Sequence, residues 1–144
     1  MIETFSRNGV TFKYPINWVL EEELDDDGDW VVTLQTPGTA LLILSYRIDA
    51  EPVELADESL EALLADYPDL DSEPTAEKIA GKIALGHDID FLAVDLPVNA
   101  QVRALDLDDA TLLLFWQMAD VDRDHYEPLI KAILASLTLS PDNN

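Results

Sequence analysis

The hydrophobic residues of this chain repeat with a period of two along most of its length, and with a helical period in only two segments. In residues 30–35, Trp30, Val32 and Leu34 alternate with a more polar set, as expected of a half-buried strand. In residues 56–69, the apolar positions fall at i, i+3, i+4 and i+7, which is the stripe of an amphipathic helix. That stripe consists of Leu60, Leu63, Leu64 and Tyr67. A chain with this pattern is restricted to the α+β class, with antiparallel strands and two helices in layers.

Further strands are expected in the stretches FSRNGVTFKYP and ALLILSYRI, and at about residues 73–80, 82–95, 98–107 and 111–119. Asn8 and Gly9 favour a two-residue type I′ turn between the first two strands, since both residues tolerate a positive φ. Pro15 should end the second strand because proline cannot donate to the ladder. The whole chain, residues 1–144, is interpreted as one domain.

Both helices carry end signals. Asp57 is expected to be the N-cap of the first helix and Pro68 to stop it. The second helix begins near DHYE, where Asp124 and Glu127 have the spacing of a capping box. Its expected buried face consists of Tyr126, Leu129, Ile130, Ile133, Leu134 and Leu137.

The charge balance is strongly acidic, with 30 acidic residues against 8 basic ones and a formal net charge of −22. Such a field repels nucleic acid and anionic membrane surfaces, so neither is expected as a partner. Cations and basic proteins are the electrostatically favoured partners. Charge alone favours solubility, or adaptation to a salty cytoplasm, over a specific binding site.

The chain contains no cysteine, which excludes disulfides, thiolate metal sites and thiol catalysis. The opening residues MIETFSRNGV lack the pattern of a signal peptide. The longest apolar runs, ALLIL and LLLFW, have the length of core strands and are too short to span a membrane. A cytoplasmic location is therefore expected.

The stretch EEELDDDGDW, residues 21–30, has seven carboxylates among ten residues. A helix-loop-helix calcium site needs a glycine at its sixth position and a glutamate at its twelfth. If Gly28 is the sixth, the loop starts at Glu23 and the twelfth residue is Leu34, which cannot bind a metal. Asp27 and Gly28 suit a primed hairpin turn. The stretch is interpreted as a turn between strands, with a weak adventitious cation site as the alternative.

The two histidines, His87 and His125, are the other candidates for chemistry. His87 shares strand parity with apolar residues such as Ile89 and Phe91, which favours a hydrogen-bonded core residue over a metal ligand. Asp90 has the opposite parity and should lie on the other face of the sheet. His125 falls in the first turn of the final helix, where exposure is expected.

No phosphate-binding, dinucleotide-binding, zinc-protease or serine-hydrolase motif occurs in the chain. We therefore expect no catalytic residue, no cofactor and no metal, and a protein that is not an enzyme. The tryptophans Trp18, Trp30 and Trp116 are expected to pack in the core, although an exposed one would be a natural binding anchor.

The order F-x-x-N-G-V-T-F-x-Y-P-x-x-W, from Phe5 to Trp18, resembles the opening of the PsbP-like superfamily. The similarity extends to the helix around Leu60, the IAGKIALGHDIDF strand pair and the closing ILASLTL. This resemblance implies an α/β/α sandwich, an antiparallel sheet of six to seven strands with helices on both faces. The superfamily includes a photosystem II subunit, a cofactor of the GTPase Ran, periplasmic lipoproteins and effector chaperones.

Because those proteins share binding rather than catalysis, the resemblance implies an acidic protein-binding module, such as an assembly or chaperone factor, with a protein partner that is basic. A small-ligand or cation-binding domain is the alternative. A pocket of several hundred cubic ångströms with convergent polar groups would favour that alternative, and a flat sheet face with exposed aromatics would favour the first.

Overall fold

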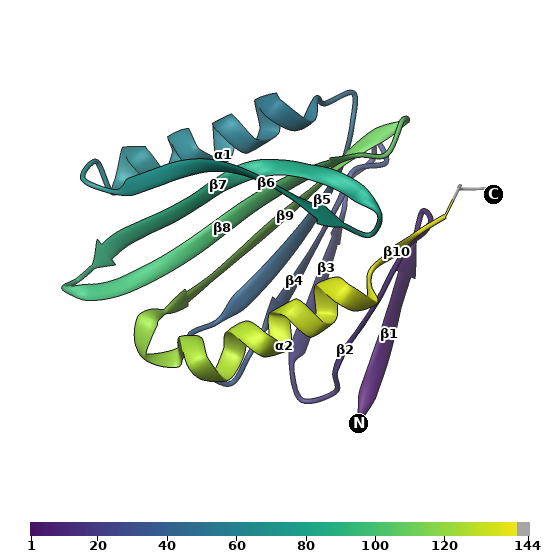
Figure 1. Cartoon of the computed structure of the whole chain (residues 1–144). Helices are drawn as coiled ribbons and strands as arrows, with labels where there is room; N and C mark the ends of the chain where they lie inside the picture. The colour runs from purple at the N-terminus through teal and green to yellow at the C-terminus, as the bar shows by residue number, and fades with distance from the viewer. Residues whose placement is uncertain (141–144) are drawn as a thin grey trace.

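The computed structural model describes residues 1–140 and contains ten strands and two α-helices within them (Figure 1). The strands are β1 (Ile2–Arg7), β2 (Val10–Pro15), β3 (Val19–Leu24), β4 (Trp30–Gln35), β5 (Leu41–Ile48), β6 (Asp71–Ile79), β7 (Lys82–Ala93), β8 (Leu96–Asp106), β9 (Ala110–Ala119) and β10 (Thr138–Leu139). The helices are α1 (Pro52–Asp66) and α2 (Arg123–Ser136), the latter preceded by the single 3-10 turn η1 (Asp120–Asp122). The four strands predicted between residues 73 and 119 are confirmed to within two residues at each end.

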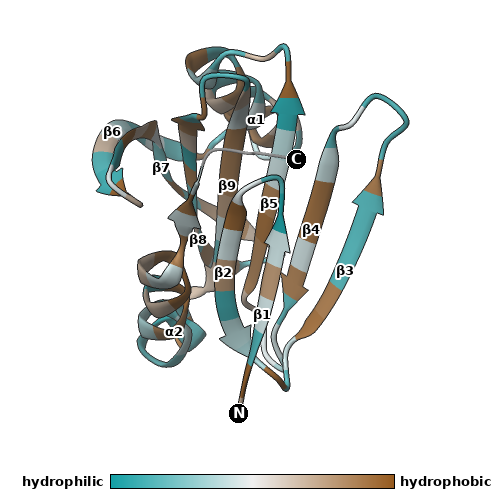
Figure 2. Ribbon diagram, turned by 90° about the vertical axis from the view of Figure 1, so that its right-hand side faces the viewer, coloured by the Kyte–Doolittle hydropathy of each residue, from teal (hydrophilic) through white to brown (hydrophobic). Residues whose placement is uncertain are grey.

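Seven strands form one antiparallel sheet in the order β3-β4-β5-β9-β8-β7-β6. A smaller sheet has the order β1-β2-β10. Strand β3 at one edge of the large sheet has a hydrophilic middle between apolar ends, whereas the central β9 is hydrophobic along most of its length (Figure 2). This difference is expected because a central strand is covered on both faces.

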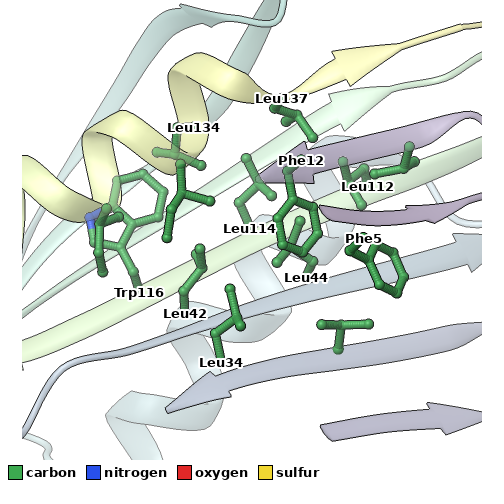
Figure 3. Close-up of a cluster of buried hydrophobic side chains, with 14 of the residues drawn as sticks. Phe5, Phe12, Leu34, Leu42, Leu44, Leu112, Leu114, Trp116, Leu134 and Leu137 are labelled. Atoms are coloured by element: carbon green, nitrogen blue, oxygen red, sulfur yellow. The ribbon is translucent and has the colours of Figure 1, made fainter. Parts of the chain in front are cut away.

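The two helices lie on opposite faces of the large sheet, so the predicted α/β/α arrangement is confirmed (Figure 1). Helix α1 packs against β7, β8 and β9, and helix α2 packs against β9 and β2. The main core lies on the α2 side, where side chains of the small sheet, the large sheet and α2 meet (Figure 3). Phe12, Leu114 and Ile130 represent these three layers, and each is fully buried. Full burial of such a side chain contributes about 1.5–3 kcal/mol.

Each face of the large sheet is covered over only part of its width. Strand β8 shows this most clearly, because Ala100, Val102 and other residues of the same parity pack beneath α1. The alternate residues Asn99, Gln101 and Arg103 face the α2 side, where α2 packs against β9. The α2 side of β6, β7 and β8 therefore forms an uncovered polar area.

Helix α1 begins earlier than predicted. Its N-cap is Glu51 and Pro52 occupies the first turn, where the fixed φ of proline suits a helix start. The predicted N-cap Asp57 is wrong, since it lies in the second turn. The extra turn buries Leu55 and Ala56, whereas Leu64 of the predicted buried stripe is 38% exposed.

Helix α2 also begins differently, although its buried face is confirmed. The N-cap is Asp122, with no side-chain capping bond, so the predicted capping box of Asp124 and Glu127 is wrong. The Asp122 carboxylate instead accepts hydrogen bonds from Thr39, at 2.9 Å from its backbone N–H and 2.6 Å from its hydroxyl. Glu127 pairs with Arg123 in the first turn at 3.3 Å.

Both predicted hairpins occur. Asn8 and Gly9 have φ values of 52° and 80° and join β1 to β2 as a two-residue turn. The turn between β3 and β4 spans five residues, 25–29, and has a positive φ at Gly28 (98°). Asp27 has no positive φ, so the expected primed turn at Asp27 and Gly28 is wrong although the corner itself is confirmed.

The three tryptophans are buried, with 4%, 1% and 2% exposure for Trp18, Trp30 and Trp116. The Trp30 indole N–H donates to Asn8 Oδ1 at 2.9 Å, and its ring stacks on Tyr46 with centroids 5.2 Å apart. The prediction that they pack in the core is confirmed, and none of them is an exposed anchor.

Candidate functional site

The uncovered α2 side of the large sheet is hollowed into a groove of about 550 Å³, here called the acidic groove. It is lined by Asp71, Ser72, Glu73, Asp88, Ile89, Asp90, Asn99, Gln101 and Arg123. Most of these residues belong to β6, β7 and β8, and Arg123 is the first residue of α2. The sheet register therefore decides which of the side chains meet.

That register places like charges directly opposite one another. Asp71 pairs with Asp90, and Glu73 pairs with Asp88. Directly opposed like charges on one face of a sheet destabilise the pairing. Within residues 1–140 no basic side chain lies within salt-bridge distance of Asp71, Glu73 or Asp90. In this part of the chain the Asp71–Asp90 pair therefore has no cation within salt-bridge distance to offset its repulsion, whereas Asp88 of the other pair has the Arg103 guanidinium 2.6 Å away.

The next strand adds amide side chains to the same two rows. Asn99 lies opposite Asp90, and Gln101 lies opposite Asp88. Asn99 is 1% exposed and its Nδ2 donates to Asp120 Oδ1 at 2.8 Å. The carbonyl oxygens Oδ1 of Asn99 and Oε1 of Gln101 are both buried, and neither has a hydrogen-bond partner in the described part of the chain.

Buried acceptors without a partner are rare in folded proteins, because leaving one unpaired costs about 1–3 kcal/mol. The acidic groove has two such acceptors side by side on one strand. They belong to the part of the groove floor formed by β8. An occupant that donates hydrogen bonds would remove this cost.

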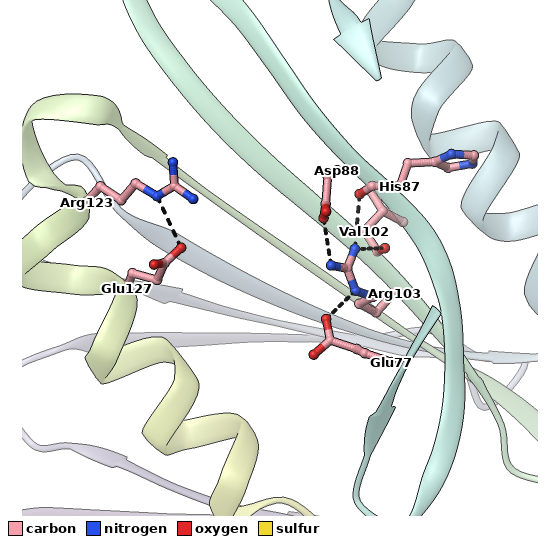
Figure 4. Close-up of polar contacts among 7 residues, drawn as sticks. All are labelled: Glu77, His87, Asp88, Val102, Arg103, Arg123 and Glu127. Carbon is pink, nitrogen blue, oxygen red and sulfur yellow. Dashed lines mark hydrogen bonds and ion pairs between the residues drawn. The ribbon is translucent and has the colours of Figure 1, made fainter. Parts of the chain in front are cut away.

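Arg103, the next residue of this parity on β8, shows how the surface holds a cation (Figure 4). Its guanidinium group is 2.6 Å from Glu77 and 2.6 Å from Asp88, and its side chain is 5% exposed. It also donates to the backbone oxygens of His87 at 3.1 Å and Val102 at 2.9 Å. Its reverse face contacts the Trp116 ring, 5.5 Å from the centroid, as in a cation–π contact.

Arg123 brings a second cation to the acidic groove (Figure 4). Its side chain is 49% exposed and its Nε is 3.3 Å from Glu127 Oε2. An exposed pair of this kind contributes little to stability and is easily rearranged.

A second hollow of about 570 Å³, here called the side hollow, adjoins the acidic groove through Asp71 and Asp90. Its apolar wall includes Tyr67 and Phe91, whose ring centroids are 4.3 Å apart. Three further carboxylates line it, those of Asp66, Asp69 and Asp120. Phe91 is 8% exposed and belongs to the core beneath α1, so the half-buried Tyr67 is the more accessible aromatic ring of the side hollow.

The acidic hairpin, residues 21–29, is built differently. Asp29 accepts a hydrogen bond from the Ile48 N–H at 2.8 Å and pairs with Arg47 at 3.2 Å. Glu22 pairs with Arg7 at 2.6 Å. No buried side-chain acceptor in this hairpin lacks a partner among the described residues. Its lack of specific calcium affinity stays a prediction.

The structure places the two histidines apart from the acidic groove. His87 faces α1 together with Ile89 and Phe91, and its Nε2 is 2.9 Å from Asp57 Oδ1. Asp90 lies on the opposite face and lines the acidic groove, as the parity predicted. The ring of His125 is exposed in the first turn of α2 and lies edge-on to Tyr126 at 4.6 Å.

In residues 1–140, no three histidine, aspartate or glutamate side chains are grouped closely enough to hold a metal ion. The sequence analysis did not single out the groove residues, apart from Asp90. The one available signal was the polar parity of Asn99, Gln101 and Arg103 in an otherwise apolar strand. Within the same residues neither helix is long and apolar enough to cross a membrane.

A scan against protein-family models gave no match, and neither did a search of curated protein sequences. Solved structures do resemble the chain. PsbP (CyanoP) of the cyanobacterium Synechocystis is 13% identical with a TM-score of 0.62, covering 96% of this chain and 92% of that one. A Pseudomonas aeruginosa protein of unknown function, PA94, is 16% identical with a TM-score of 0.59, covering 97% and 98%.

LpqN of Mycobacterium tuberculosis, described as involved in cell envelope biogenesis, is 13% identical with a TM-score of 0.53. That match covers 98% of this chain and 91% of LpqN. At these identities the likeness concerns the fold. The chain has the PsbP-like fold, an α/β/α sandwich around an antiparallel seven-stranded sheet.

Proposed function

We propose that the protein is a non-enzymatic module that binds a basic partner protein at the acidic groove. The observation that supports this proposal is that two pairs of carboxylates lie directly opposite one another on an uncovered sheet face. Asp71 opposes Asp90, and Glu73 opposes Asp88. Carboxylates held in this way raise the local negative potential, which attracts a basic surface and speeds its association.

The side hollow supports the same proposal. A basic partner segment that enters the groove can place an apolar side chain against the half-buried Tyr67 in the side hollow. Aromatic side chains beside a polar rim are typical of the centre of protein interfaces. Leu92 of the side hollow and Val94 of the adjacent turn add exposed apolar surface, at 63% and 100% exposure.

The small-ligand alternative is favoured by one observation, the size of the side hollow. Its volume of about 570 Å³ falls within the range of small-molecule sites, roughly 300–1,000 Å³. A thermal-shift screen of small aromatic amines tests this alternative, which predicts stabilisation that is lost in the Phe91→Ala variant.

The test of the main proposal is capture from nuclease-treated native lysate at about 0.01 M and 1 M salt, where the Debye length is roughly 30 Å and 3 Å. Three baits are compared: the wild type, Asp71→Asn with Asp90→Asn, and Asp26→Asn with Asp27→Asn as a control of equal charge in the acidic hairpin. The wild type and the hairpin control should retain the same partner at low salt, and the groove variant should lose it. Equal retention by the two double variants would contradict the proposal.

A cytoplasmic location is part of the proposal and rests on the composition of the chain. Cell fractionation followed by immunodetection tests it. Recovery with the envelope fraction would contradict it.

A further inference from the structure

We infer that the acidic groove is a binding site for a guanidinium group, the side-chain cation of arginine, supplied by the partner. The inference rests on the proposed function, because the partner provides the arginine, and it adds the chemical group that the groove selects. The main observation behind the inference is Asn99, which is 1% exposed, lines the acidic groove and has an Oδ1 without a hydrogen-bond partner in the described residues.

The unpaired oxygens require an occupant that donates hydrogen bonds. Asn99 Oδ1 and Gln101 Oε1 are acceptors, and the Asn99 Nδ2 bond to Asp120 at 2.8 Å fixes the orientation of that amide. The surrounding carboxylates also accept hydrogen bonds only. The occupant must therefore donate to several oxygens and accept from none.

The charges require that this donor be a cation. Asp71 opposes Asp90 with no cation of residues 1–140 within salt-bridge distance, and a neutral donor such as water would leave that repulsion in place. A metal ion would need a set of close carboxylate or histidine ligands, which residues 1–140 do not assemble. A nitrogen cation satisfies both the acceptors and the charges.

The chain itself shows which nitrogen cation this surface holds. Arg103 lies two residues after Gln101 on the same face of β8, with carboxylates of β6 and β7 on two of its nitrogens. The backbone carbonyl oxygens of His87 and Val102 accept from its third nitrogen. The row of Asp71, Asp90 and Asn99 offers carboxylates of β6 and β7 plus an amide carbonyl oxygen, and no arginine of residues 1–140 is paired with its carboxylates. In the row between, Asp88 is bound by Arg103, which leaves the Glu73 carboxylate and Gln101 Oε1. Guanidinium has a flat fork of five donors that can reach separated acceptors, which an ammonium group lacks.

Arg123 lies at the rim of the groove and allows a second test of the guanidinium site. Its positive charge opposes the entry of another cation, and its partner Glu127 is 3.3 Å away in a half-exposed pair. Arg123→Gln should therefore strengthen arginine binding by about twofold, in keeping with the small energies of exposed charges.

The experiment is an NMR titration of the full chain with the capped tripeptides Gly-Arg-Gly and Gly-Lys-Gly at about 0.01 M salt. The arginine peptide should shift the side-chain amide signals of Asn99 and Gln101 and bind at least several-fold more tightly than the lysine peptide. Equal affinity of the two peptides, or shifts confined to the acidic hairpin, would overturn the guanidinium assignment.

Gln101→Met is the decisive variant. Methionine keeps the length of the side chain and removes an amide with no hydrogen bond in the described residues, so the melting temperature should stay equal or rise. Arginine binding should weaken about tenfold, the loss expected for a hydrogen bond to a charged group. The control is Gln117→Met, which changes the opposite face of the sheet and should leave binding unchanged.

A destabilised Gln101→Met variant with unchanged arginine affinity would assign a structural role and overturn the inference. The lysate capture distinguishes the two proposals. If the Asp71→Asn, Asp90→Asn double variant loses the partner but the arginine peptide does not bind the wild type, the protein-binding function is supported and the guanidinium site is contradicted. If the arginine peptide binds the wild type as expected and the double variant keeps the partner, the guanidinium site is supported and the protein-binding function is contradicted.

Discussion

The acidic hairpin and the acidic groove share a composition and differ in construction. In the hairpin the carboxylates lie close together in sequence and point into solvent, apart from Asp29 and Glu22, which have cationic partners. In the groove they come from β6 and β7, oppose one another across the sheet and surround two unpaired buried oxygens. The difference teaches that a site depends on register and burial rather than on the density of acidic residues along the chain.

The largest expected effect concerns the buried cation next to the groove. Arg103→Met should lower the free energy of unfolding by about 2–4 kcal/mol, because Glu77 and Asp88 lose their partner. The lower end allows for the partial exposure of those carboxylates, at 36% and 49%. Urea unfolding measures the effect.

The matched variant in the hairpin is Arg47→Met, whose side chain is 45% exposed beside Asp29. An exposed pair of this kind contributes at most about 1 kcal/mol. Equal losses in the two variants would show that the groove and the hairpin hold their charges alike.

His87 tests whether the two faces of the sheet act separately. His87→Ala should lower stability by about 1–3 kcal/mol, through the lost bond to Asp57 and the cavity left beside α1. Thermal unfolding measures the loss, and binding of the arginine peptide should be unchanged, since the ring faces away from the groove. Unchanged stability together with lost binding would move His87 into the site.

Much of the fold could be predicted from the sequence, because strand parity and helix periodicity are local patterns. The buried face of α2 and the Asn8-Gly9 turn are examples. The start of α1 was missed because the N-cap signal at Asp57 competed with Pro52, whose preference for a first turn extends the helix. Local signals decide which residues point inward, and several nearby signals can compete for one helix end.

The acidic groove could not be predicted in the same way. Asp71 and Asp90 are 19 positions apart and meet only through the β6–β7 register. The Asn99 amide is held by Asp120, which lies 21 positions later in the chain, so its unpaired Oδ1 also depends on tertiary structure. The carboxylates of the hairpin, in contrast, lie within nine consecutive positions, so their proximity is visible in the sequence and requires no folding.

A smaller effect is expected at Asp122, a carboxylate with local donors. The hydroxyl and then the backbone N–H of Thr39 lower the pKa of Asp122 below its usual value. Since the folded pKa is depressed, this carboxylate contributes stability above the unfolded pKa, about 3.9, and the contribution is lost as the pH falls through the folded pKa. Asp122→Asn should be less stable than the wild type at pH 7, and the difference should vanish in acid. A difference that persists unchanged at low pH, measured by urea unfolding, would contradict this cause.

The smallest expected effect is that of calcium on the acidic hairpin. Its carboxylates are turn and surface residues, so isothermal titration should show no specific site. A dissociation constant well below about 10⁻⁴ M, the range of weak extracellular calcium modules, would make the hairpin a site after all.

The most direct test of the comparison is the salt dependence of the melting temperature in three proteins. These are the wild type, Asp71→Asn with Asp90→Asn, and Asp26→Asn with Asp27→Asn. With a net charge of −22, the wild type should gain stability as salt rises from about 0.01 M to 1 M and screens its repulsion. At low salt the groove variant should melt at a higher temperature than the wild type, because its free energy of unfolding is larger by roughly 0.5–1 kcal/mol. Its melting temperature should also increase less with salt. The hairpin variant should behave almost as the wild type does. Equal behaviour of the two double variants, or a wild-type melting temperature that stays flat or falls with salt, would contradict the account.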